Sequence, residues 1–348
     1  MERVLVTGAG GYIGTTLVPM LVQQGYAVRA VDRFFFGEDK LPQHPLVERV
    51  KTDARMLEPE HFAGVSAVID LVAISNDPSG ELFREATQQI NDRARVRCAQ
   101  LAKEAGVRRY VLPSSCSIYG FQAPEVICTE TTPTNPLTQY AKSNERAEQG
   151  VLALAEDSFC VAVLRQATVY GYSPRMRFDL AINGMTYGAW KTGVLPLMRD
   201  GSQWRPMLHV RDAARAQLFM LTAPAEQVNG QLFNVGSEQN NYQLGPLAET
   251  VADCLPVRPE IQWYGDPVHR SYRVSFEKIE RLGWKAELVA RDGVEEICAR
   301  LEDGTLTRDD TTITLDWYQE LVRWHRIIKD VELGGGILDI EGVERWLA

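Results

Sequence analysis

A glycine-rich turn near the amino terminus constrains the fold of this chain more than any other feature. Gly8, Gly11 and Gly14 recur at three-residue spacing, after the apolar run at residues 4–6 and before a helical stretch. Glycine permits a tight turn and lets the backbone approach a pyrophosphate, whose charge the N-terminus of the next helix stabilises. The turn therefore predicts the first strand and helix of a parallel sheet that binds a dinucleotide.

Short apolar runs alternate with helical stretches as far as residue 171. Strands are expected at residues 3–7, 27–32, 67–71, 109–113 and 160–165. Helices are expected at 15–24 and 90–105, each followed by a glycine suited to end it. Because strand–helix alternation places parallel strands between two layers of helices, the predicted fold class is α/β with a Rossmann-type doubly wound parallel sheet.

The pattern becomes irregular after residue 171 and returns with an expected helix at 210–221 and an expected strand at 232–236. We therefore expect a dinucleotide-binding domain and a smaller, discontinuous substrate-binding lobe with a C-terminal helical tail. The domain is assigned residues 1–171 with 209–238 returning to it, and the lobe 172–208 and 239–348.

The expected tail helix at 315–329 has apolar side chains at helical spacing. They are Trp317, Tyr318, Leu321, Val322 and Ile328. Core packing or a subunit contact explains this face better than a cofactor site.

An acidic residue ends the second expected strand, eighteen residues after Gly14. A carboxylate there accepts hydrogen bonds from the ribose 2′-hydroxyl and repels a 2′-phosphate. Asp32 therefore favours NAD over NADP, although the adjacent Arg33 carries the opposite charge. Tyr12 and Ile13 in the glycine turn are also expected to contact the cofactor.

The composition excludes several classes of partner. The formal net charge is −9, which argues against nucleic acid, and no apolar run approaches the ~20 residues that span a bilayer. The six cysteines lie far apart, as expected of reduced packing residues rather than metal ligands. Because the chain enters a strand at once, without a signal-like segment, we expect a cytoplasmic protein with no bound metal and no membrane contact.

Several further motifs accompany the glycine turn. They are Thr52-Asp53 with Arg55, Asp70-Leu71-Val72-Ala73, Asn91, the run Ser114 to Gly120, Pro136-x-x-x-Tyr140, and the run Trp204 to Asp212. Together they resemble the extended short-chain dehydrogenases/reductases, the NAD-dependent nucleotide-sugar epimerase/dehydratase family, over about residues 3–300. The likeness is to UDP-glucose 4-epimerase-like members, and it implies a nucleotide-sugar substrate and a homodimer.

The resemblance assigns roles to individual residues. Tyr140 takes the place of the base that removes a sugar hydroxyl proton, and Ser115 that of the hydroxyl that steadies the same oxygen. The implied cofactor contacts include Asp53, Ala54, Leu71, Ala73, Asn91 and Tyr140. The implied substrate contacts are Ser75, Ser115, Arg175, Arg205 and Arg270, with Arg273 as the alternative to Arg270 and Arg177 beside Arg175.

One position departs from the family pattern. A free tyrosine, with a pKa of about 10, is a poor base at neutral pH, and the family corrects this with a lysine four residues later. Here that place holds Asn144, and Lys142 points to nearly the opposite side of the helix. Asn144 is expected to contact a nicotinamide ribose hydroxyl, and Asn144→Lys to preserve or raise activity at lower pH.

Three interpretations of the departure at Asn144 stay open. The nicotinamide ring or an arginine from the second lobe supplies the missing charge, another group is the base, or the protein binds NAD and nucleotide sugars without turnover.

The residues after Ser115 bear on the reaction. Family dehydratases carry Asp and Glu where this chain has Cys116 and Ser117, so a 4,6-dehydratase is disfavoured. Cys116 is either a proton-transfer group or a buried structural thiol. An epimerase acting through transient oxidation at C4 fits best; a nucleotide-sugar 4-ketoreductase or dehydrogenase and a non-catalytic binder are the alternatives.

Overall fold

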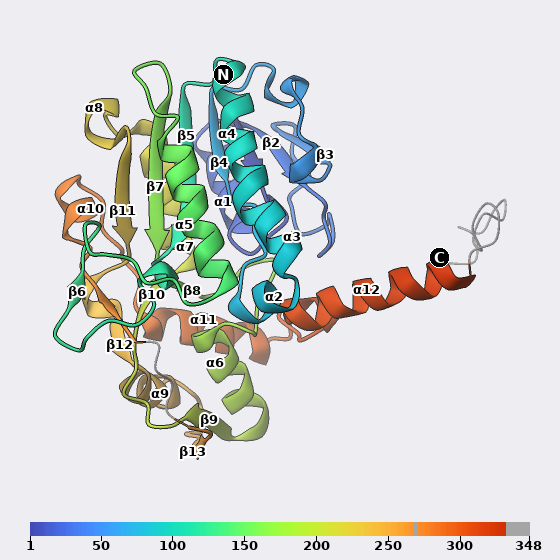
Figure 1. Cartoon of the computed structure of the whole chain (residues 1–348). Helices are drawn as coiled ribbons and strands as arrows, with labels where there is room; N and C mark the ends of the chain where they lie inside the picture. The colour runs from blue at the N-terminus through green and yellow to red at the C-terminus, as the bar shows by residue number, and fades with distance from the viewer. Residues whose placement is uncertain (267–270, 332–348) are drawn as a thin grey trace.

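The computed structural model describes residues 1–266 and 271–331, and its centre is a seven-stranded parallel sheet (Figure 1). Its strands are β1 (Arg3–Thr7), β2 (Ala27–Asp32), β3 (Val47–Lys51), β4 (Ala67–Asp70), β5 (Arg109–Ser115), β7 (Cys160–Gln166) and β11 (Gln231–Val235). They lie in the order β11-β7-β5-β4-β1-β2-β3. The expected Rossmann-type α/β fold is confirmed.

Helices cover both faces of the sheet because its buried strands are apolar on both sides. α1 (Gly14–Gln23) and α7 (Val210–Thr222) pack on one face, where Val4 and Val6 point. α4 (Arg95–Glu104) and α5 (Gln139–Leu152) pack on the other, where Leu5 points. Successive residues of β1 thus fill two separate cores, as the two-residue period of a strand requires.

The strand order fixes where a ligand binds. β1 lies between β2 and β4, so the chain leaves β1 to one side first and returns later to the other. At such a switch point the connecting loops diverge and open a crevice at the carboxyl ends of the strands. The glycine turn after β1 lies at this crevice.

Two elements differ from the sequence expectation. β3 was not among the expected strands, because three of its five residues are charged and it lies at the edge of the sheet. The helix expected at 90–105 begins earlier: α3 (Arg84–Gln88) runs through a π-helical segment, Gln89–Ala94, into α4. π-Helical turns are rare and are found frequently at functional sites.

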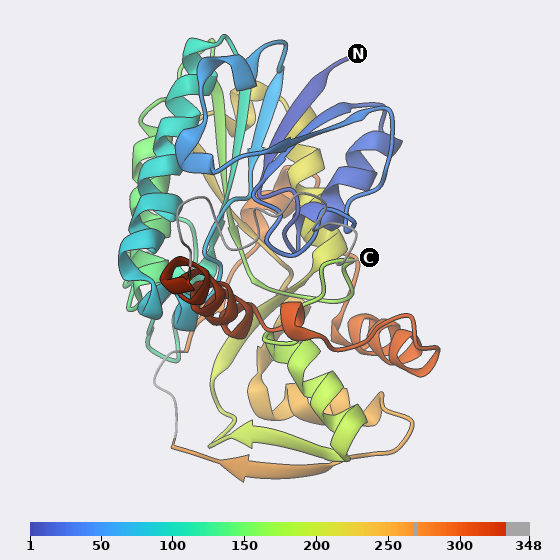
Figure 2. The ribbon, with the colours of Figure 1, turned by 90° about the vertical axis from the view of Figure 1, so that its right-hand side faces the viewer.

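A second lobe lies below the carboxyl edge of the sheet (Figures 1 and 2). Its helices are α6 (Ala181–Thr192), α9 (Leu244–Asp253) and α11 (Ala290–Glu302). In one of its sheets β10 (Trp204–His209) lies between β8 (Thr168–Tyr170) and β12 (Asn241–Gln243), and in the other β9 (Val194–Met198) pairs with β13 (Glu260–Tyr264). Tyr170, Ile182 and Leu247 contribute to a separate apolar core there.

The remaining elements are short. They are α2 (Asp77–Leu82), β6 (Ile127–Cys128), α8 (Ala225–Val228), β14 (Arg273–Val274) and α10 (Glu277–Arg281). Among the helices of the described ranges, none is long and apolar enough to cross a membrane.

The last described helix, α12 (Thr314–Val331), returns from the lobe to the mouth of the crevice (Figure 2). The indole Nε1 of Trp317 donates to the backbone oxygen of Phe35, 2.6 Å away, in the loop after β2. The far end of α12 projects from the body of the molecule (Figure 1).

Candidate active site

The crevice is a cavity of about 650 Å³ between the sheet and the lobe. The ends of β1, β2, β4 and β5 form one wall, and the segment after β8 forms the other. Its lining includes, from the predicted site, Gly8, Gly11, Tyr12, Ile13, Gly14, Asp32, Arg33, Asp53, Ala54, Leu71, Ala73, Ser75, Ser115, Ser117, Tyr140, Arg175 and Arg205. Residues more than 190 positions apart in the sequence thus converge on one cavity.

The glycine turn has no room for side chains at two positions. Gly8 adopts a φ of +63°, which favours glycine, and a Cβ on it would lie 2.8 Å from the backbone nitrogen of Val72. A Cβ on Gly14 would lie 2.5 Å from the carbonyl oxygen of Ala9. The turn therefore brings its backbone close to the cavity at the N-terminus of α1, which fits the pyrophosphate of a dinucleotide.

Asp32 ties the end of β2 to this turn. Its carboxylate accepts hydrogen bonds from the backbone N–H of Gly10, at 3.0 Å, and of Phe34, at 2.6 Å. Burial raises the pKa of Asp32 from its ordinary value, and the two N–H groups oppose this shift. Arg33 does not face Asp32: it pairs with Asp53 at 3.0 Å, so the carboxylate of Asp32 remains the charge beside the ribose position.

Asp32→Asn is expected to reverse much of the preference for NAD. The amide keeps an acceptor for the turn but removes the charge that repels a 2′-phosphate. One charge-assisted hydrogen bond contributes roughly 1.5–3 kcal/mol, so NAD affinity should fall about tenfold or more while NADP affinity rises. Calorimetric titration with both cofactors measures this, and Asp39→Asn in the next loop is the control. Unchanged selectivity would remove Asp32 from the ribose site.

The loop after β4 carries Leu71, Ala73 and Ser75 into the cavity. Asn91 lies behind this loop, fully buried: its Oδ1 accepts from the N–H of Ile74 at 2.8 Å, and its Nδ2 donates to the Ile74 oxygen at 2.9 Å. Asn91 is not among the lining residues in the described chain. In place of the direct cofactor contact expected from the sequence, the structure gives Asn91 the task of holding the loop.

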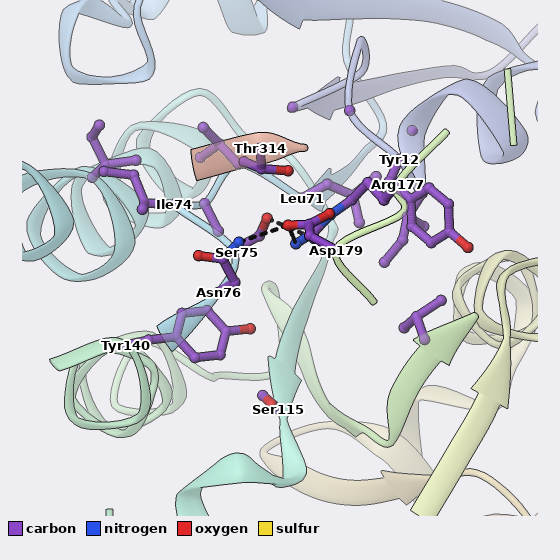
Figure 3. A pocket seen from close by; sticks show the side chains of 18 of the residues that line it. Tyr12, Leu71, Ile74, Ser75, Asn76, Ser115, Tyr140, Arg177, Asp179 and Thr314 are labelled. Carbon is purple, nitrogen blue, oxygen red and sulfur yellow. Dashed lines mark hydrogen bonds and ion pairs between the residues drawn. The ribbon is translucent and has the colours of Figure 1, made fainter. Parts of the chain in front are cut away.

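Tyr140 and Ser115 come together at one end of the cavity (Figure 3). Tyr140 projects from the first turn of α5, which Thr138 caps by accepting from the N–H of Ala141. Ser115 ends β5, and its hydroxyl faces the Tyr140 side chain closely enough to act to lower the pKa of Tyr140. The structure therefore brings together the two hydroxyl groups that the sequence assigns to the reacting oxygen.

The environment of Tyr140 works against ionisation. Burial raises the pKa of its hydroxyl above the ordinary value, and the nearby Asp77 carboxylate raises it further. Hydrogen bonds from Ser115 and Asn144 and the charge of Arg95 act in the opposite direction. A positive charge bound in the cavity beside Tyr140 would lower this pKa toward the working range of a base.

Asn144 lies behind Tyr140 rather than in the cavity wall. It is 1% exposed and is not among the described lining residues. Its Nδ2 donates to the backbone oxygen of Tyr140 at 3.1 Å, and its Oδ1 accepts from Arg95 at 3.1 Å. These bonds differ from the ribose contact expected from the sequence. Lys142 is exposed, in agreement with its predicted orientation.

Cys116 and Ser117 separate in the structure. The Cys116 thiol is buried, donates to the backbone oxygen of Arg165 at 3.1 Å and lies outside the described lining, and burial raises its pKa well above the ordinary value. This is the structural-thiol alternative. Ser117 lines the cavity, and its hydroxyl has no hydrogen-bond partner within the described chain.

Arginines line the opposite wall. Arg205 on β10 faces the cavity and lies near the Tyr272 ring, 5.6 Å from guanidinium carbon to ring centroid. Arg177 pairs with Asp179 at 2.7 Å and donates to the Ser75 hydroxyl at 3.0 Å, which bridges the two walls (Figure 3). Of the alternatives Arg270 and Arg273, Arg270 lies outside the described residues, and Arg273 donates to the Pro124 oxygen away from the cavity.

Arg175 is a buried cation with unused donors. Its Nη2 donates to Thr314 at 2.9 Å and its guanidinium lies 3.6 Å from the Phe36 ring centroid, but Nε and Nη1 have no partner among the described residues. Burial and the neighbouring charge of Arg177 lower its pKa. Its backbone N–H donates to Thr15 at 3.3 Å, so Arg175 lies beside α1, the helix that follows the glycine turn. A bound phosphate would supply acceptors for Nε and Nη1.

The tail helix corrects a prediction. Tyr318, Leu321 and Val322 line the cavity, so the prediction that this apolar face serves only packing or a subunit contact is wrong for them. The Tyr318 ring contacts Phe35, Phe36 and Phe83, with centroids 5.8–6.3 Å apart. The periodicity of α12 showed the face but not its partner.

Tyr318→Ala is expected to speed dissociation of the cofactor. The change removes an aromatic group that lines the cavity beside the loop after β2. Since an aromatic pair is worth ~0.5–1.5 kcal/mol beyond its buried area, the Kd for NAD should rise severalfold to about tenfold. Trp324→Ala is the matched control, because Trp324 lies on the same helix, is 57% exposed and lies beyond the cavity. Equal affinities in the two variants would contradict this role.

The fold and cavity define a Rossmann-type dinucleotide-dependent enzyme, with the glycine turn, Asp32 and Tyr140 around one site. The family model that matches residues 4–236 describes the NAD dependent epimerase/dehydratase family.

A putative UDP-glucose 4-epimerase of Methanocaldococcus jannaschii is 25% identical over 319 residues, covering 87% of this chain and 100% of the relative. UDP-glucuronic acid decarboxylase 1 of Arabidopsis thaliana is 24% identical over 323 residues, covering 88% of this chain and 72% of the relative. Among solved structures, MoeE5 in complex with UDP-glucuronic acid and NAD is similar with a TM-score of 0.77 and 26% identity, covering 87% of this chain and 100% of that one.

The chain belongs to the NAD dependent epimerase/dehydratase family. It is an NAD-dependent enzyme of the short-chain dehydrogenase/reductase type, and the resemblance seen in the sequence is confirmed.

Proposed function

We propose that the protein is a nucleotide-sugar epimerase that oxidises a sugar hydroxyl, at C4, to a ketone and then reduces the ketone from the other face. The observation that carries this proposal is the convergence of Tyr140 and Ser115 in one cavity. The two residues that follow Ser115 in the chain, Cys116 and Ser117, carry no carboxylate. Relatives that act on UDP-sugars, and a similar structure that holds UDP-glucuronic acid with NAD, support the substrate class.

Each residue has a definite task in this proposal. The glycine turn, Asp32 and Arg175 hold the cofactor, and Arg205 binds the substrate pyrophosphate with its planar, permanently charged fork. NAD, when bound, accepts and returns the electron pair removed from the sugar carbon. Tyr140 takes the hydroxyl proton and gives it back, while the Ser115 hydroxyl fixes the position of the same oxygen.

The side chains at positions 116 and 117 argue against elimination, because neither is a carboxylate. Removal of water across C5 and C6 requires a second proton acceptor and a proton donor beside the ketone. Cys116 is buried outside the cavity lining, and a serine hydroxyl such as that of Ser117 is a weak acid. Return of the hydride to the same carbon needs no further acid or base, which favours epimerisation.

The test begins with the ligands of the purified protein. Denaturation followed by mass spectrometry is expected to release NAD, because an enzyme that recycles its cofactor has no need to exchange it. The same preparation is then given UDP-glucose, UDP-galactose, UDP-glucuronic acid and UDP-N-acetylglucosamine without added cofactor. Formation of a C4 epimer supports the proposal; a product that forms only with added NADPH makes the protein a 4-ketoreductase; retained NAD with no turnover makes it a binding protein.

A further inference from the structure

The position of the missing lysine is occupied by a hydrogen-bonded pair and not by a single uncharged side chain. Asn144 follows Tyr140 by one helical turn, on the same face of α5. Its Nδ2 donates to the backbone oxygen of Tyr140 at 3.1 Å, and the same amide acts to lower the pKa of the Tyr140 hydroxyl. Its Oδ1 accepts from Nη1 of Arg95, which comes from α4 and lies 49 residues earlier in the chain. The amide is therefore a bridge from Tyr140 to a cation.

Arg95 is a buried cation whose charge and donors are compensated by its neighbours. Only 2% of it is exposed, and its Nη2 donates to the backbone oxygens of Asp70, at 2.8 Å, and of Pro113. Its Nε lies 3.4 Å from the Asp70 carboxylate. A buried cation is costly unless it is paired and its donors are satisfied. Arg95 meets both conditions, with a carboxylate on one side and the Asn144 oxygen on the other.

The anion of this pair is held away from Tyr140. One oxygen of Asp70, which ends β4, accepts from the Tyr110 hydroxyl at 2.6 Å, and the other accepts from the Thr7 hydroxyl. Asp70 itself is fully buried. These two hydroxyls draw the negative charge toward the sheet, and the guanidinium lies between it and Asn144. The pair thus presents its positive end to α5.

We propose that Arg95, acting through Asn144, replaces the lysine and stabilises the phenolate of Tyr140; this inference rests on the proposed function. The guanidinium donor fixes the orientation of the amide, so that its N–H groups face Tyr140, and polarises them. Arg95 is a positioning residue because it touches neither substrate nor cofactor. The other groups that face Tyr140 are Ser115 from β5 and the Asp77 carboxylate from α2, which opposes the effect of Arg95.

The geometry also changes the expectation for Asn144→Lys. A lysine at that position would place a second cation beside the Arg95 guanidinium and remove the Oδ1 acceptor of Arg95. The buried site holds one counter-charge, Asp70, for the two cations, and the excess buried charge destabilises the fold. The single variant is therefore expected to lose stability and activity, contrary to the expectation from the sequence. Arg95→Met with Asn144→Lys removes one cation as it introduces the other, and this double variant is expected to retain both.

The experiment measures the pH dependence of kcat for the sugar nucleotide that the unaltered holoenzyme converts fastest among the four named above. Arg95→Met should move the acidic limb of the kcat–pH profile to higher pH by about one unit. Asp70→Asn, which keeps the cation and removes its counter-charge, should move the limb downward. The double variant Arg95→Met with Asn144→Lys should return the limb to the unaltered position. A merely structural role would lower kcat in all variants without opposite shifts.

A second readout does not depend on turnover. Ultraviolet difference titration of each variant against the same variant carrying Tyr140→Phe reports the ionisation of Tyr140 in the NAD complex, and its midpoint should shift as the kinetic limb does. If Arg95→Met fails to fold, Arg95→Met with Asp70→Asn removes both charges, and its limb should lie above that of Asp70→Asn alone.

The outcomes separate the two proposals. If the acidic limbs of the kcat–pH profiles and the titration midpoints do not shift while turnover still depends on Tyr140, the role of Arg95 is overturned. The proposed function then still holds. Full turnover in Tyr140→Phe, or no turnover of any of the four nucleotides by the unaltered enzyme, overturns the proposed function itself.

Discussion

Tyr140→Phe is expected to lower kcat by about 10²–10⁴-fold while leaving NAD affinity nearly unchanged. The factor is that of a positioned general base, and the change removes one oxygen from a residue whose ring stays in place on α5. Ser115, whose hydroxyl faces Tyr140, keeps the hydrogen bond from the N–H of Ser117 at 3.1 Å. The substrate KM should therefore change much less than kcat.

The measurement is a steady-state comparison with Tyr264→Phe, since Tyr264 is 51% exposed on β13 and lies outside the described lining of the cavity. A loss of kcat confined to Tyr140→Phe supports Tyr140 as the base. Similar kcat values in the two variants would mean that another group removes the proton.

Gly14→Ala is expected to abolish most NAD binding. The added Cβ would lie 2.5–2.7 Å from backbone atoms of Gly8 and Ala9, so the turn has to shift and cannot keep its approach to the pyrophosphate. Each charge-assisted hydrogen bond lost costs roughly 1.5–3 kcal/mol, or about 10- to 150-fold in affinity. With more than one bond affected, a loss of at least 100-fold is expected.

Gly188→Ala in α6 is the control for this variant. A Cβ there meets no atom within 4 Å, and alanine favours a helix over glycine by roughly 1 kcal/mol. Its NAD affinity should equal that of the unaltered protein, and its thermal stability should be equal or higher. If Gly14→Ala bound NAD as tightly as Gly188→Ala, the turn would not hold the cofactor.

The predictable part of the molecule is the part with local causes. The turn at Gly8 and Gly14 follows from backbone space, and the bounds of β1 and β2 follow from short apolar runs ended by a turn or an acidic residue. The roles of Tyr140 and Ser115 were implied by the resemblance of their motifs to the family, and the structure places both residues in one cavity. In each case a few neighbouring residues determine the result.

The site residues that the sequence did not predict depend on contacts between residues far apart in the chain. Nothing around Arg95 indicates that it meets Asn144, because the packing of α4 beside α5 brings them together. Tyr318 reaches the loop after β2 from the last described helix, with Trp317 bonded to Phe35 across 282 positions. Asn91 and Asn144 lie next to the cavity but are buried behind its described lining. Residue spacing indicates the face of a helix but not how deeply a side chain is buried.

The most direct test of the central claim follows a label through the reaction. UDP-glucose deuterated at C4 is incubated with the holoenzyme without added cofactor, and the nucleotide sugars are analysed by proton NMR and mass spectrometry. UDP-glucuronic acid with the same label is used if it is converted faster. The account predicts a C4 epimer that retains its deuterium, with no net reduction of the cofactor. A product that has exchanged the label with solvent, or reduced cofactor that accumulates in step with product, would contradict it.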